Sequence, residues 1–198
     1  VGLNKFLIQA NKVSDKNIYV SNWLREVFYK EGIYVGYRYF NTFNVKPSYE
    51  FGFGESYTTF EYSDIAFSSN NFKDEIKVSV KVTNTGNVAG KEVVQVYVSA
   101  PSKMLDKPSE ELRAFGKTKL LQPGKSQKLT FTLKAKDLAS FVDAKSAWIA
   151  EKGTYTVKIG ASSLDIKTAE NFNLANDITV EKVNNTFDLD VDMETLKN

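Results

Sequence analysis

Alternation of apolar and polar residues with a period of two is the feature that most constrains the fold of this chain. Residues 76–82 place Ile or Val at every second position, and residues 129–133 alternate Leu or Phe with Thr. Residues 94–98 and 155–159 repeat the pattern. A period of two puts the apolar side chains on one face of a strand and the others on the opposite face. These stretches therefore predict half-buried strands.

Turn residues separate the predicted strands at short intervals. Gly86 and Gly90 lie in one connection, and Pro123-Gly124 has the residues of a type II turn. Pro101 and Pro108 keep the polar loop of residues 100–111 out of the sheet. No stretch of helical periodicity separates the strands, which disfavours a parallel sheet. Short strands with frequent turns are typical of an antiparallel sandwich, so the predicted fold is all-β and immunoglobulin-like.

Residues 31–60 are rich in aromatic residues and glycine, and they lack a regular period. This composition predicts an extended segment that packs its rings against a larger body. We expect this segment to be an interdomain strap that wraps a neighbouring domain. Ahead of it, Ser21 as N-cap and Gly32 as a stop predict a short helix.

Three regions follow from these patterns. Residues 1–60 are expected to be the end of a preceding domain together with the strap, an irregular and partly helical N-terminal extension. Residues 61–175 are expected to form the sandwich. Residues 176–198 are expected to be a tail with one strand at 178–183 that docks on a neighbour or frays.

Composition excludes several functions. The chain has no His and no Cys, which removes Ser-His-Asp and Cys-His catalysis, thiolate metal sites and disulfides. It has 26 Lys and Arg against 24 Asp and Glu, so no strong basic field is available for nucleic acid. No apolar run reaches the roughly 18 to 20 residues that span a bilayer. The first residues do not resemble a signal peptide.

Short motifs give weak functional signals. Gly52 and Gly54 form G-x-G, but Tyr57 stands where a dinucleotide loop needs a third glycine, so turn packing is the expected role. The G-E-S of residues 54–56 fails as a nucleophile elbow without any His. Acidic residues near the C-terminus occupy the first three ligand positions of a calcium loop, but Met193 stands where that loop requires glycine. These acidic residues are Asp188, Asp190 and Asp192.

Polar and aromatic residues offer three further candidates. Glu110 and Glu111 are adjacent, so in extended chain they point to opposite sides, and a solvated loop is their expected setting. Exposed aromatic residues can stack on sugars, but core or interdomain packing is the expected role here. The rings in question are Tyr97, Trp148 and Trp23. Asn184-Asn185-Thr186 is a glycosylation sequon.

Several motifs, in order, resemble the C-terminal region of glycoside hydrolase family 3, the β-glucosidases and β-xylosidases. They are EGIYVGYRYF (31–40), FGFGESYTTF (51–60), VKVTNTGNVAGKEVVQVYVSAP (80–101), ELRAFGKTKLLQPGKSQKLTFTL (111–133) and WIAEKGTYTVKIGASS (148–163). The resemblance covers residues 31–174 and implies a fibronectin type III-like sandwich. One departure is Glu55, where relatives often have Leu, and it bears only on local packing.

The resemblance implies that the parent enzyme is a retaining hydrolase of β-linked glucosides or xylosides. In the family an Asp attacks the anomeric carbon and a second residue, often Glu, acts as acid–base. Both motifs lie upstream of the matched region and map onto no residue here. We therefore expect no catalytic, cofactor-binding or metal-binding residue in this chain and no cofactor. The family also implies a periplasmic or secreted location.

The leading hypothesis is a non-catalytic region that stabilises the upstream catalytic domains of the same protein. Its 101–111 loop is a candidate to approach the active-site mouth, where the oligosaccharide substrate of the parent enzyme binds. The alternative is a sandwich module that binds carbohydrate or protein by itself. A third interpretation, a self-sufficient hydrolase, predicts turnover by the chain alone, which we do not expect. Exposed aromatic residues also predict self-association of the isolated chain.

Overall fold

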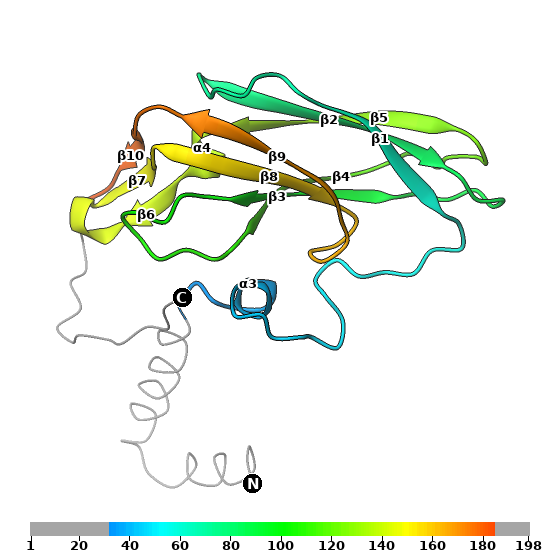
Figure 1. Cartoon of the computed structure of the whole chain (residues 1–198), viewed down its shortest axis with the longest axis horizontal. Coiled ribbons are helices and arrows are strands. Elements are labelled where there is room, and N and C mark those ends of the chain that lie inside the picture. Colours follow the sequence, from blue (N-terminus) through cyan, green and yellow to red (C-terminus); the bar gives the residue numbers. More distant parts are fainter. Residues whose placement is uncertain (1–31, 185–198) are drawn as a thin grey trace, which may run out of the picture.

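The computed structural model describes residues 32–184 and shows a two-layer β-sandwich (Figure 1). One sheet contains β1 (Phe60–Phe67), β2 (Glu75–Asn84) and β5 (Ser126–Lys134), in the order β1-β2-β5. The other contains β3 (Val93–Ser99), β4 (Glu111–Lys117), β8 (Gly153–Gly160) and β9 (Ile166–Leu174), in the order β4-β3-β8-β9. Neighbouring strands pair antiparallel throughout both sheets, which confirms the predicted all-β fold class.

A small third sheet closes one end of the sandwich. It has the order β10-β7-β6, formed by β6 (Ser140–Val142), β7 (Ala147–Ala150) and β10 (Ile178–Lys182). The one-turn helix α4 (Ala135–Leu138) leads into β6, and the 3-10 turn η1 (Asp143–Lys145) connects β6 to β7. β10 is the strand expected in the tail, and its pairing with β7 continues the fold beyond residue 175.

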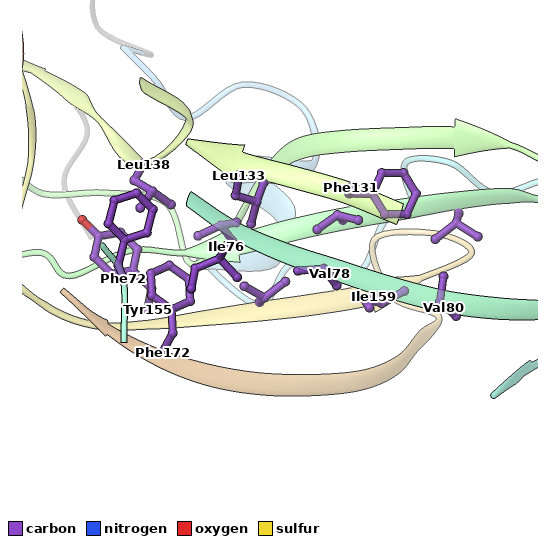
Figure 2. Close-up of a cluster of buried hydrophobic side chains, with 14 of the residues drawn as sticks. Phe72, Ile76, Val78, Val80, Phe131, Leu133, Leu138, Tyr155, Ile159 and Phe172 are labelled. Atoms are coloured by element: carbon purple, nitrogen blue, oxygen red, sulfur yellow. The ribbon is translucent and has the colours of Figure 1, made fainter. Parts of the chain in front are cut away.

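The core lies between the two large sheets. The apolar positions predicted by the period of two point inward, and those of β2 are completely buried. Figure 2 shows this cluster, in which the rings of Tyr155 and Phe172 stack with centroids 5.2 Å apart and planes only 4° from parallel. Burying each such side chain contributes about 1.5–3 kcal/mol. The buried positions of β2 are Ile76, Val78, Val80 and Val82.

Strand β3 differs from the other strands because both of its faces are buried. Val94, Val96 and Val98 face the core, and the outward residues Gln95 and Tyr97 are 5% and 0% exposed. A residue that is buried on the outer face of a sandwich needs a cover outside the two sheets. That cover is the segment before β1.

Asn84 organises the connection between β2 and β3. Its amide nitrogen donates to the carbonyls of Val88 and Leu121, each at 2.8 Å. Its amide oxygen accepts from the Thr58 hydroxyl at 2.7 Å and from the Gly86 nitrogen at 3.0 Å. A Cβ at Gly86 would lie 2.2 Å from the Thr58 hydroxyl, so this approach requires glycine. The connection and the end of the preceding segment are therefore fixed together.

The predicted turn at residues 122–125 is present. The Lys125 nitrogen donates to the Gln122 carbonyl at 2.9 Å, and Gly124 has a φ of 73°. A positive φ at the third position is the requirement of a type II turn. Among the described residues, no helix has the length and apolar content needed to cross a membrane.

Candidate functional site: the strap and its ledge on the sandwich

Residues 32–59, the strap, run along the outer face of the four-stranded sheet before the chain enters β1 (Figure 1). The strap contains one short helix, α3 (Tyr37–Thr42), which lies on the side of the sandwich where β3 is covered. The sequence predicted that this segment wraps a neighbouring domain. The structure shows that part of the strap packs on the sandwich of this chain, and its contact with a neighbouring domain stays a prediction.

A cluster of three aromatic rings joins the strap to β3. Tyr37 stacks on Phe51 with centroids 4.9 Å apart and meets Tyr97 edge-on at 5.8 Å. The Tyr37 hydroxyl also accepts a 2.7 Å hydrogen bond from the Leu112 nitrogen. Burial, followed by the nearby Tyr37 and Glu110, raises the pKa of Tyr97 well above its ordinary value. Its hydroxyl therefore remains protonated and donates to Gln95.

The two adjacent glutamates at the start of β4 hold the helix of the strap. Glu110 accepts from the Asn41 amide at 2.6 Å and from the Lys158 ammonium at 2.7 Å. Glu111 pairs with Arg38 at 3.1 Å and with Arg113. The expectation that these glutamates are solvated is wrong, because they are only 4% and 6% exposed. A buried carboxylate requires such partners to offset the loss of water.

The loop of residues 101–111, called the ledge below, is held in place beside the strap. The Lys107 ammonium lies 2.5 Å from a Glu151 carboxylate oxygen, and both side chains are almost completely buried. The other oxygen of Glu151 accepts from the nitrogens of Lys103 and Met104 at 3.1 and 2.9 Å. Lys107 also donates to the Pro101 carbonyl at 2.8 Å. The loop is thus tied to the end of β7, and its exposed residues are confined to the outer rim.

Hydrophobic contacts secure the same loop. Met104 and Leu105 pack against a small buried cluster on the third sheet. Tyr34 of the strap is 4% exposed, and burial together with the neighbouring Asp106 raises the pKa of its hydroxyl. The ledge of residues 101–111 therefore contacts the third sheet on one side and the strap on the other. The third-sheet cluster is Val142, Ala147 and Ile149.

The opposite side of the strap exposes large apolar side chains. Tyr57 is 99% exposed and Tyr49 is 74% exposed, although residues of this size are usually at least partly covered. Contiguous exposed apolar groups mark sites of contact with another protein surface. Part of the strap is thus held by hydrogen bonds and ring contacts with the sandwich, whereas other large apolar residues of the strap remain exposed. Ile33, Val35 and Val45 are also exposed. Phe51 and Phe53 are half-exposed, but Phe51 belongs to the ring cluster at β3 and Phe53 faces the sandwich across a cleft.

The structure places most of the other candidates apart. Gly52 has a φ of 84°, and a Cβ there would lie 2.3 Å from the Gln95 side chain, so it serves close packing as expected. Tyr97 is buried beneath the strap, whereas Trp148 is on the third sheet beside Phe141, so they form no common platform. In residues 32–184, no group of three or more acidic or metal-ligating side chains is arranged for a metal ion.

Some sequence candidates lie outside the described residues. Trp23 and the helix expected at residues 21–32, except Gly32, lie there. So do the acidic residues of the calcium-like motif and the last two residues of the sequon at 184–186. The acidic residues are Asp188, Asp190 and Asp192.

Replacing Tyr37 with Leu is expected to loosen the strap from β3. The variant loses the ring stack on Phe51 and the hydrogen bond from Leu112, which should lower the free energy of unfolding by about 2 kcal/mol. Limited proteolysis should cut the strap faster in Tyr37→Leu. Tyr49→Leu is the matched control, because its ring is largely exposed. Equal proteolysis of the two variants would contradict the role given to Tyr37.

The comparisons with known proteins agree with this architecture. Residues 92–163 match the model of the fibronectin type III-like domain. β-Glucosidase A of Butyrivibrio fibrisolvens is 43% identical over 180 residues, covering 80% of this chain and 22% of that protein. Thermostable β-glucosidase B of Acetivibrio thermocellus is 41% identical over 158 residues, covering 79% and 21%. The fold and the matched segment thus define a protein with a fibronectin type III-like domain.

Solved structures narrow this class further. β-Glucosidase 3B of Thermotoga neapolitana, solved with α-D-glucose, is 49% identical, with a TM-score of 0.71 over 76% of this chain and 20% of that chain. The GH3 β-glucosidase of Bifidobacterium adolescentis is 37% identical, with a TM-score of 0.70 over 74% and 21%. In sequence and fold, the chain corresponds to part of the C-terminal region of glycoside hydrolase family 3 β-glucosidases. It spans about a fifth of the length of these relatives.

Proposed function

We propose that this chain is a non-catalytic region of a β-glucosidase that stabilises the catalytic domains of the same protein. The exposed side of the strap carries the proposal. Tyr49 and Tyr57 present uncovered rings on a segment whose opposite side is fixed to the sandwich. Because the relatives are about five times longer, the matching surface would belong to the rest of the parent protein.

The state of the buried carboxylates supports a non-catalytic role. A retaining glycosidase needs two carboxyl groups about 5–5.5 Å apart that face the sugar. Glu110, Glu111 and Glu151 are each held by a cation and lie beneath the strap or the ledge. These glutamates therefore serve packing, and we expect no hydrolysis of nitrophenyl glucosides by this chain alone.

The finer roles of the chain remain predictions. Any contact of the 101–111 loop with the active-site mouth would be made by its exposed residues, for example Lys103. The base of the loop is not available, because Lys107 is buried there against Glu151. Lys103→Ala in the full-length enzyme should then change the kinetics on longer oligosaccharides more than on a nitrophenyl glucoside. A periplasmic or secreted location also remains a prediction.

Charges placed on the exposed side of the strap should weaken the full-length enzyme. Tyr49→Asp with Tyr57→Asp would bury two carboxylates in the proposed contact, so we expect a clearly shorter half-life of activity on heating. The kcat of the enzyme that stays folded should change little. Phe115→Asp is the control, because Phe115 is 71% exposed on β4. Equal half-lives of the double variant and the control would overturn the proposal.

A further inference from the structure

A cleft of about 560 Å³ lies between residues 50–58 of the strap and one end of the sandwich. The strap forms one wall, and residues of β1, β3 and the turn before β9 form the other. The volume falls in the range of small-ligand sites. The cleft does not include the Tyr37 cluster or the ledge, although its lining residues Gly52 and Thr58 also pack against Gln95 and Asn84.

A half-buried carboxylate lies on the sandwich side of the cleft. Glu92 accepts from the Tyr62 hydroxyl at 3.2 Å and from the Val93 nitrogen at 3.2 Å. Burial raises the pKa of Glu92, partly offset by those two hydrogen bonds and by Lys167. The Lys167 ammonium lies 6.0 Å from the centroid of the Tyr62 ring. An aromatic ring and a fixed carboxylate therefore lie side by side.

The strap side of the cleft is also held in place. Glu50 accepts from the Ser162 hydroxyl at 2.9 Å, and that hydroxyl in turn accepts from the Asp165 nitrogen at 2.9 Å. Asp165 pairs with Lys167 at 2.6 Å. Phe53 lines the cleft with a ring that is 48% exposed. The polar groups are thus fixed by one another before any ligand arrives, which reduces the cost of binding.

The chemistry of the lining selects among ligand classes. Four carboxylates disfavour a phosphate or nucleotide. The described residues include no group of acidic side chains arranged for a metal ion. A purely apolar ligand would displace water from the charged groups without replacing the hydrogen bonds of that water. A neutral ligand with many hydroxyl groups satisfies both the carboxylates and the ammonium groups. The carboxylates are Glu50, Glu55, Glu92 and Asp165, and the ammonium groups are those of Lys91 and Lys167.

We propose that this cleft binds a sugar, with the Phe53 ring against one face of the pyranose and Glu50 and Glu92 accepting from its hydroxyl groups. Sugar rings present apolar C–H edges that pack on aromatic faces. Phe53 supplies such a ring in a lining that also contains carboxylates and ammonium groups. All of the lining residues belong to this chain, so the site can be tested on the 198-residue chain.

Titration with cellobiose, followed by the amide NMR shifts of the chain, tests the proposal. Saturable shifts confined to the strap residues 50–58 and the facing residues 91–93 and 161–167 are expected. Phe53→Ala should weaken binding about tenfold, equivalent to about 1.4 kcal/mol. Glu92→Gln, which keeps an oxygen for Tyr62, should also weaken it. Phe115→Ala and Glu170→Gln are the matched controls, because both residues are exposed away from the cleft.

Three results would overturn the site. They are the absence of saturable shifts, shifts centred elsewhere on the sandwich, or equal effects of Phe53→Ala and Phe115→Ala. Sorbitol tests the need for a ring, and equal binding of sorbitol and cellobiose would contradict stacking on Phe53. A negative titration would leave the strap's docking role intact, because that role is measured by heat inactivation of the full-length enzyme.

Discussion

Replacement of Lys107 with Met is expected to lower the free energy of unfolding of the chain by about 3–5 kcal/mol. The Glu151 carboxylate would keep its two backbone donors but lose the ammonium that lies 2.5 Å away. Removal of one partner leaves an unpaired buried charge, which costs far more than the net contribution of the pair. Methionine preserves most of the volume, so the effect reports the charge and not a cavity.

Urea denaturation followed by tryptophan fluorescence measures this change. Lys103→Met is the matched control, because Lys103 lies on the same loop with an exposed side chain. The control should stay within about 0.5 kcal/mol of the parent chain. If the two variants unfold at the same urea concentration, Lys107 does not anchor the ledge.

Replacement of Asn84 with Ala is the second large effect, with an expected loss of about 3 kcal/mol. Four hydrogen bonds converge on this fully buried amide. Its removal leaves the Thr58 hydroxyl, the Gly86 nitrogen and the Val88 carbonyl without this partner, whereas the Leu121 carbonyl keeps the Gly90 nitrogen as a donor. Each unsatisfied buried group carries a desolvation cost. Because Thr58 ends the strap, the variant should also expose residues near 58 to proteases.

Asn171→Ala is the control for this second experiment. Asn171 is an exposed residue of β9 whose side chain accepts one hydrogen bond from Thr156. Thermal unfolding should show little change in the control and a much lower midpoint in Asn84→Ala. A similar midpoint in both variants would mean that solvent replaces the four hydrogen bonds, and the account of this connection would fail.

The large sheets could be predicted from the sequence because their information is local. Period-two runs such as residues 76–82 indicate which face of a strand is buried, and the Pro123-Gly124 pair indicates where the chain reverses. The family resemblance then indicated a fibronectin type III-like sandwich. The short helix α3 was not predicted, because six residues between glycine-rich and aromatic stretches give little periodic signal.

The site could be predicted only in part, because its partners are distant in sequence. Glu110 lies 69 residues from Asn41 and 48 from Lys158, so no local pattern distinguishes it from a solvated loop residue. One signal was available in β3. Its outward residues Gln95 and Tyr97 are less polar than the charged residues expected on a solvent-exposed face. If β3 had been interpreted as buried on both faces, the sequence would have indicated that another segment covers the sandwich from outside.

The attachment of the strap at two places limits where the parent protein can bend. Asn41 is fastened to Glu110 near the start of the strap, and Thr58 is fastened to Asn84 at its end. Residues 41–58 are therefore poorly suited to serve as a hinge between the sandwich and the rest of the parent protein. For the same reason, a chimera that exchanges sandwiches between related enzymes should join them upstream of Tyr34, since a junction at residue 60 would pair a foreign strap with the wrong ledge.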